Sequence, residues 1–424
     1  MKTQPNTENF LLAAKQSEIN ALKRLMLSSK LVIRVTELIH ELQKERGLSN
    51  SFLVSEGNRF AKERTAELKI TQAALDQFIE ALEWLDLKNC GSSTIRLYSS
   101  IAFVLHQLDD LPQFRAQLSQ QKVKASENTK FFNHLIAGLL SVIFEAADIS
   151  NDPDITRALV ALFNFVQGKE YAGQERAWGV IGFTVGEFNS PTRDQIHALQ
   201  EAQQRCFSIS CDFSTAIPNA LWRQLEEDEA TAELGKMRQL ITRFQSGNSV
   251  PTSISEVWYQ AATVRIDGMQ TIVKQMTEEL LKLSQDKITL AEEELRLHKE
   301  QLVKLANYEE PPMSPLTAMD ENKTNTTVSI SQGVNVKLAH SLYDLVQRQA
   351  THLQKVSEEL SAAKQTLNER KQIEKAKGIL MSTQKVDEEQ AYKQLRQAAM
   401  DGNKRIIDIA ENIISVASML TNKP

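Results

Sequence analysis

One arginine lies on a helical stripe that is otherwise apolar. Residues 31, 35, 38, 39 and 42 form this stripe in a predicted helix over residues 30–55, and Arg46 is the next position along it. An unpaired charge on a buried face is costly, so the guanidinium needs either a carboxylate partner or an anionic ligand. Its planar donors suit planar oxyanions. Arg46 is therefore a candidate anion-binding residue, and the alternative is a structural ion pair with Glu45 or Glu170.

A second candidate, Arg176, lies in the segment GKEYAGQERAWG. Glycines in this segment allow neighbouring helices to approach closely, here beside a cation. Two arginines together with helix N–H groups would suffice to hold a small anion in a tiny enclosed pocket.

Basic side chains gather in a third region, residues 370–405. Nine Lys or Arg residues stand against five acidic ones there, a balance of +4, whereas the whole chain carries −5 and the remainder therefore −9. This polarity indicates one part that meets a polyanion, attached to a larger part that does not.

Length, composition and cysteine count limit the classes of protein to which this chain can belong. With 424 residues, 42% of them hydrophobic, the chain is expected to form two or three domains. Its three cysteines form no CxxC pair and no histidine is spaced to complete a zinc site, so neither a disulfide framework nor a structural metal is expected. The first residues lack an apolar signal core, and the longest apolar run, 135–144, is too short to cross a bilayer. The cysteine usage and the missing signal core and membrane span predict a cytoplasmic protein. With no P-loop, HExxH or GxSxG motif, the sequence also predicts that the protein is not an enzyme.

The pattern along the chain predicts an all-α fold. Long segments place apolar residues at i, i+3, i+4 and i+7, prolines fall between these segments, and alternating strand patterns are missing. A Pro-rich and then polar stretch predicts a linker over residues 307–336. The next segment, 337–369, has a heptad pattern of Ala339, Leu342, Val346, Leu353, Val356, Leu360, Ala363 and Leu367. It predicts either a coiled coil or one amphipathic helix docked on the large domain.

Residues 370–424 are predicted to form a small three-helix bundle. Asp387 with Gln390 matches a capping box that begins the second helix, Asp401-Gly402 ends it, and Asn403 can cap the third. The predicted inner faces comprise Ile373, Ala376, Ile379, Leu380, Ala391, Leu395, Ala399, Ile406, Ala410, Ile413 and Ala417.

The charges of this bundle favour RNA over DNA. A helix-turn-helix would need base-reading polar groups on its last helix, yet residues 406–420 are mostly apolar and include Asp408 and Glu411. The cations lie instead at helix ends and on the second helix, where they could contact the phosphates and unstacked bases of an RNA loop. The candidate RNA-binding residues are Lys377, Tyr392, Lys393, Arg396, Lys404 and Arg405, although each cation could be a solvated surface group and Tyr392 a core residue.

The same segment resembles a known family. The run IEKAKGILM, followed by EEQAYKQLRQAAMDGNKR and an Ile/Ala-rich last helix, is similar to the ANTAR domain, an RNA-binding transcription antitermination module. The resemblance covers roughly residues 367–416, and several short motifs in one order make it specific. It implies leader mRNA hairpins as the partner.

The N-terminal part resembles NIT domains, all-helical nitrate and nitrite sensors built from two helical bundles. Four segments carry this resemblance in the order found in that family: LQKERGLS, LPQFRAQL, KEYAGQERAWG and WYQAATVRIDGM. It implies a nitrate or nitrite ligand, with no cofactor and no metal, held between helices by Arg46 and Arg176. Arg115 and Arg265 also lie inside these segments but are weaker candidates, because arginines there could equally tie helices together. Arg238, on a helical segment that flanks the apolar stripe Leu234, Met237 and Ile241, is weaker still.

These features predict a one-component switch. A helical sensor over residues 1–306 binds the anion, and the C-terminal module then binds leader mRNA and prevents formation of a terminator hairpin, acting on the transcription complex indirectly. Without the anion, the acidic sensor is expected to mask the basic module. The alternative is a helical signalling scaffold that binds a protein partner through its coiled coil, and the heptads also suggest a homodimer.

Overall fold

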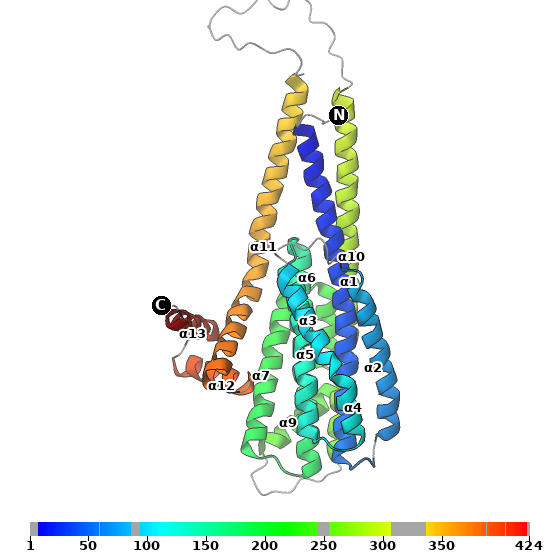
Figure 1. The fold of residues 1–424 in the computed structure, drawn as a ribbon, viewed down its shortest axis with the longest axis vertical. Coiled ribbons are helices and arrows are strands. Elements are labelled where there is room, and N and C mark those ends of the chain that lie inside the picture. The colour runs from blue at the N-terminus through cyan, green and yellow to red at the C-terminus, as the bar shows by residue number, and fades with distance from the viewer. Residues whose placement is uncertain are drawn as a thin grey trace, which may run out of the picture. The chain divides into compact units, whose positions relative to one another are not determined.

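The computed structural model is all-α, as predicted (Figure 1). It describes residues 7–58, 60–85, 94–243, 254–306, 336–386, 388–402 and 404–421, and no strand occurs among them. The helices are α1 (Thr7–Val54), α2 (Ala61–Leu82), α3 (Ile95–Asp109), α4 (Leu111–Ser119), α5 (Ala125–Asp148), α6 (Pro153–Val185), α7 (Ser190–Phe213), α8 (Ala216–Glu226), α9 (Glu229–Arg243), α10 (Ile254–Ala306), α11 (Val336–Gln384), α12 (Glu388–Asp401) and α13 (Ile406–Thr421).

The chain divides into two compact units. The first comprises residues 1–27 and 281–358, and the second comprises residues 28–280 and 359–424. In the first unit the beginning of α1 packs on the end of α10 through Ile19, Ala291 and Leu295. Lys15 of α1 strengthens this contact by donating to Glu294 at 2.7 Å.

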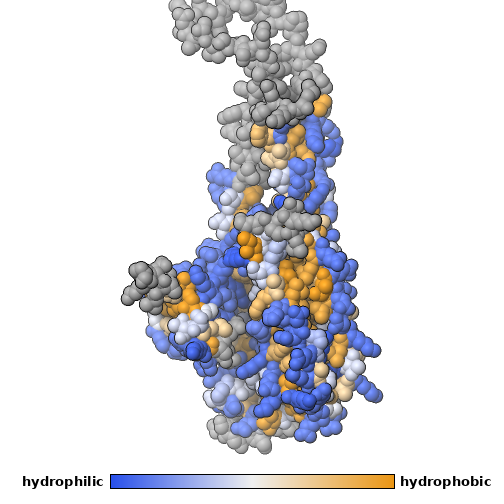
Figure 2. All heavy atoms as spheres, viewed as in Figure 1, coloured by the Kyte–Doolittle hydropathy of each residue, from blue (hydrophilic) through white to orange (hydrophobic). Residues whose placement is uncertain are grey.

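The second unit contains two helical bundles. In one, α5 lies beside both α3 and α6 (Figure 1), and Phe114 of α4 stacks on Phe131 of α5 with ring centroids 3.9 Å apart. The other has a buried core from α6, α7, α9 and α10 that includes Phe183, Leu234 and Trp258. In the view of Figure 2 most described residues on the surface are hydrophilic, as expected when the apolar stripes face these cores.

Helix α6 belongs to both bundles, and local signals set its ends. The Asp152 side chain accepts from the Ile155 amide at 3.0 Å, and Pro153 begins the helix, where a missing N–H costs nothing. Gly186 ends it in the left-handed conformation, at φ 77°. Because most residues between these ends are buried, α6 can place side chains at the centre of the unit.

The C-terminal module is a three-helix bundle of the predicted kind. Ala376, Leu395 and Ala410 form its buried centre, one from each helix. Its first helix is the end of α11, which runs without a break through the predicted boundary at residue 370. Asp387, Asn403 and residues 307–335 of the linker predicted over 307–336 lie outside the described residues, as do the side chains of most heptad positions, and residue 336 already belongs to α11.

The expectation that the longest apolar segment is too short to cross a bilayer needs correction. Residues 135–144 are too short to cross a bilayer, but they belong to the 24-residue helix α5, which by length and composition alone could do so. More than half of its most apolar window, 56%, is buried, and α5 packs against α3 and α6.

The close approach of α6 and α10 gives a test of the packing. A Cβ at Gly179 would overlap the indole ring of Trp258, which is fully buried. Gly179→Ala should therefore destabilise the protein by about 1–3 kcal/mol through overpacking, measured as a lower thermal unfolding midpoint. The control is Gly235→Ala in α9, where a Cβ would meet no atom within 4 Å. Equal effects of the two substitutions would contradict this packing.

Candidate anion site and basic C-terminal module

Arg46 lies in the buried interface between α1 and α6. Its side chain is fully buried, and the guanidinium donates to both carboxylate oxygens of Glu170, at 2.5 and 3.2 Å. It also donates to Asn133 at 2.5 Å. Of the two ion-pair partners that the sequence allows, Glu170 is the one used here. The other, Glu45, is held by Arg115 in two bonds of 2.7 and 2.8 Å.

Arg176 differs from Arg46 because it has neutral partners. Its guanidinium donates to the Thr263 hydroxyl at 2.9 Å and to the Gln43 carbonyl at 3.1 Å, and it lies 5.2 Å from the centre of the Tyr259 ring. Among the described residues no carboxylate forms an ion pair with it. Burial, and the nearby charge of Arg46, hold the pKa of Arg176 below its usual value. Such a cation is suited to take up an anion.

Two glycines allow the two arginines to lie between the same helices. A Cβ at Gly173 of α6 would come within 2.5 Å of an Arg46 nitrogen, and a Cβ at Gly47 of α1 within 2.8 Å of an Arg176 nitrogen. Each guanidinium thus packs on a glycine of the opposite helix. The sequence indicated that glycines of the segment around Arg176 lie beside that cation; Gly173 of this segment instead contacts Arg46, and Gly47 of α1 contacts Arg176.

The buried polar layer carries more positive than negative charge. Arg46, Arg176 and Glu170 are each at most 2% exposed, so two guanidinium groups face one carboxylate. The Nε atoms of both arginines are buried and have no hydrogen-bond partner among the described residues. Unsatisfied buried donors and an uncompensated charge are both costly, and one monovalent oxyanion would relieve both costs.

A neighbouring group of buried polar residues was not identified from the sequence. Lys169 is 1% exposed, donates to Gln270 of α10 at 2.7 Å, and lies 3.1 Å from Nδ1 of His40 of α1. Lys169 lies inside the segment that contains Arg176, but only its buried setting distinguishes it from a surface lysine. No group of three or more His, Cys, Asp or Glu side chains suited to a metal ion occurs among the described residues.

The weaker arginine candidates all pair with acids. Besides Arg115, Arg238 binds both oxygens of Glu175 at 2.6 and 2.7 Å, and Arg265 donates to Glu226 at 2.9 Å. These pairs connect neighbouring helices, and tying helices together is the role that the sequence offered as the alternative to anion binding. They leave Arg176 as the candidate arginine without a carboxylate partner in the described part of the chain.

The predicted RNA-binding residues fall into two groups. Lys393, Lys404 and Arg405 are exposed, with Arg405, which directly precedes α13, paired to Asp408 of α13 at 3.1 Å. Lys377 is 7% exposed, lies against the Tyr392 ring and pairs with Glu374, so RNA could not reach it in this arrangement. A glutamate three residues before Lys377 was the available sign that this lysine has a local partner.

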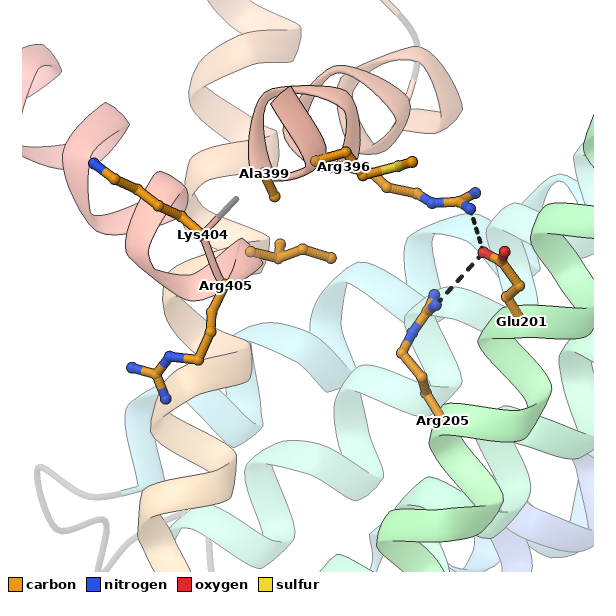
Figure 3. Close-up of a pocket in the computed structure, with 8 residues that line it drawn as sticks. Glu201, Arg205, Arg396, Ala399, Lys404 and Arg405 are labelled. Atoms are coloured by element: carbon orange, nitrogen blue, oxygen red, sulfur yellow. Dashed lines mark ion pairs between the residues drawn. The ribbon is translucent and has the colours of Figure 1, made fainter. Parts of the chain in front are cut away.

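Tyr392 and Arg396 are engaged by the sensor helix α7. Arg396 forms an ion pair with Glu201, and Arg205 donates to the Tyr392 hydroxyl at 3.0 Å. Figure 3 shows Arg396 and Arg205 both directed at Glu201, with Lys404 and Arg405 lining the same pocket.

The end of α11 makes further contacts with the sensor. Arg370 donates to Gln167 at 3.0 Å and lies 4.6 Å from the centre of the Phe163 ring, both on α6. Lys371 pairs with Asp148 at 2.5 Å. Arg370 and Lys371 belong to the basic segment of residues 370–405, and their sensor partners were not predicted from the sequence.

Comparisons with known proteins identify the families of both parts of the chain. The family model for nitrate and nitrite sensing (NIT) matches residues 37–281, and the ANTAR domain model matches residues 361–414. The chain is 30% identical to the nitrate regulatory protein of Klebsiella oxytoca over 416 residues, covering 98% of this chain and 96% of that protein. The solved structure of the NasR transcription antiterminator is similar with a TM-score of 0.62 and 28% identity, covering 98% of this chain and all of that one. The chain belongs to the nitrate and nitrite sensing family and carries an ANTAR domain.

Proposed function

We propose that this protein is a nitrate- or nitrite-responsive transcription antiterminator, in which Arg46 and Arg176 bind the anion. The observation that carries this proposal is the excess positive charge buried between α1 and α6, where, among the described residues, Glu170 is the one carboxylate that pairs with either Arg46 or Arg176. One singly charged anion neutralises that excess. The NIT and ANTAR matches support an anion input and an RNA output in one chain.

The geometry favours a small planar anion. The free Nε donors of Arg46 and Arg176 offer in-plane hydrogen bonds to oxygen atoms, and the glycine contacts leave little room for a larger ligand. A doubly charged anion would exceed the one positive charge by which these two guanidinium groups outnumber Glu170. Nitrate and nitrite satisfy both conditions.

The output end is proposed to be masked by the sensor when no anion is bound. Glu201 engages Arg396, Arg205 engages Tyr392, and Asp148 engages Lys371, so sensor residues occupy part of the surface that would contact RNA. Anion binding would weaken these contacts by favouring a different packing of α6, to the extent that the two states differ in anion affinity. The exposed Lys393, Lys404 and Arg405 then join Arg396 on one RNA-binding surface.

We place the protein in the cytoplasm as a regulator without enzymatic activity, acting on the transcription complex through leader mRNA hairpins. The heptad pattern in α11 supports a homodimer.

Removing Arg176 tests the anion site. Arg176→Ala should weaken nitrate binding about 10- to 100-fold, because a charged donor is lost, as measured by isothermal titration calorimetry. It should also abolish the rise in unfolding temperature that nitrate gives the unmodified protein. The matched control is Arg34→Ala, which removes the same charge from α1 at a half-exposed pair with Glu37. Unchanged nitrate affinity in Arg176→Ala would reject the site.

Reversing a charge on the sensor tests masking without touching the RNA-binding module. Glu201→Lys should repel Arg396 and raise nitrate-free affinity for leader RNA about three- to tenfold, given the modest strength of partly exposed ion pairs. Asp194→Lys is the control, since it makes the same charge change at an exposed position of α7. Gel-shift titrations without nitrate measure both variants. If the two bind RNA equally, Glu201 does not mask the module.

Salt dependence separates RNA binding from the scaffold alternative. If Lys393, Arg396, Lys404 and Arg405 contact phosphates, RNA affinity of the nitrate-bound protein should fall roughly 50-fold between 50 and 200 mM salt. Fluorescence anisotropy with a two-hairpin RNA gives the slope. Weak or salt-insensitive binding would favour a protein partner instead.

A further inference from the structure

Lys169 is a buried amine whose hydrogen-bond partners are neutral. It donates to the side-chain oxygen of Gln270 at 2.7 Å and lies 3.1 Å from Nδ1 of His40, so α1, α6 and α10 all contribute to its surroundings. Within the described part of the chain it forms no ion pair. A charged lysine can only donate, so Nδ1 of His40 then accepts and the imidazole stays neutral. Burial, followed by the charge of Lys169, lowers the pKa of His40 and keeps it neutral.

Charged groups on each neighbouring helix act on Lys169 from a greater distance. Glu41 and Lys44 lie on α1, Glu170 on α6, and Asp267 on α10, while Lys274 of α10 acts on His40. Burial outweighs the acids among them and lowers the pKa of Lys169 to about 7. A small change in the local charge can therefore decide whether this amine carries a proton near neutral pH.

The anion site is the place where such a change would occur. Lys169 directly precedes Glu170, which holds Arg46, and Arg176 lies seven residues along the same helix, about 10 Å away by helical rise. Solvent and salt screen interactions between buried groups only weakly, so a bound anion would act on the amine over this distance.

Resting on the anion site proposed above, we propose that Lys169 is a positioning residue that couples anion binding to the uptake of one proton. The proton passes from solvent to Nζ when the anion binds, and no bond to the anion is made. Nitrate is the anion of a strong acid and takes up no proton in this range. Since a negative charge favours the ammonium form, affinity should be highest below pH 7 and fall as the pH rises.

The test is calorimetry of the full-length protein with nitrate at pH 6, 7, 8 and 9, in buffers of different ionisation enthalpy. The dependence of the observed heat on the buffer gives the number of protons taken up per nitrate bound. We expect little uptake at pH 6, a fraction of a proton between pH 7 and 8, and an affinity about tenfold lower at pH 9 than at pH 6, which corresponds to a coupling of one pKa unit.

Two substitutions of Lys169 separate its charge from its packing. Lys169→Met, a neutral side chain of similar length, should bind nitrate more weakly at pH 6 and take up no proton. Lys169→Arg keeps a fixed charge and should bind with an affinity that no longer falls with pH. If Lys169→Met does not fold, the Lys169→Arg profile and the proton count of the unmodified protein still decide the question.

A matched control excludes another group that titrates in the same range. Burial and a hydrogen bond with Glu41 raise the pKa of Glu67 to about 8, and Glu67→Gln should leave proton uptake unchanged. Nitrate binding without proton uptake at pH 7–9, or uptake that persists in Lys169→Met, would overturn the role of Lys169 and leave the anion site standing. Failure of the unmodified protein to bind nitrate at any pH would instead reject the site itself.

Discussion

The uncompensated positive charge between α1 and α6 is the constraint on which the rest of the second unit depends. Arg46 is fully buried on Glu170, and Arg176 lies close by with neutral partners only. Gly47 and Gly173 leave the space that the two guanidinium groups occupy, because a side chain at either position would force the guanidinium beside it to shift. Long, capped helices supply the rigidity that holds two like charges near each other. The fold thus retains an electrostatic cost, which the proposed anion would remove.

Helix α6 connects the buried arginines to the C-terminal module, because it contacts both. Lys169 and Arg176 lie on nearly the same side of the helix, since seven residues make about two turns. Gln167 and Phe163, which receive Arg370 of α11, lie four residues apart on a roughly opposite side. A small rotation or shift of α6 would therefore change the surroundings of the anion and of Arg370 together. Helices packed without voids move between discrete arrangements, which suits a switch.

Sequence periodicity predicted that Arg46 is buried, but it could not predict which residues pair with the buried charged side chains. Arg46 was predicted to be buried because its position follows from the stripe at 31, 35, 38 and 42, and helical geometry alone decides that. Its partner could not be chosen, because Glu170 comes from a helix more than a hundred residues away. Lys169 was missed for the same reason, as its neutral partners are on α1 and α10. Lys377 has the composition of a surface cation but is covered by Tyr392 and paired with Glu374.

The relative size of the interactions explains how one small anion could control a whole module. Shifting a two-state equilibrium from 1:99 to 99:1 requires about 5.5 kcal/mol of differential binding. An uncompensated buried charge costs several kcal/mol. Its neutralisation by the proposed anion would therefore release a free energy of the same order as the differential binding that the shift requires. The contact between Glu201 and Arg396 involves side chains that remain 31% and 28% exposed, and such pairs contribute about 1 kcal/mol or less. In the proposed switch the anion site is buried and the masking contacts are partly solvated. The free energy gained by neutralising the buried charge can therefore exceed the free energy of the masking contacts. The reverse arrangement, with a solvated anion site and a buried mask, could not be released by a monovalent ion.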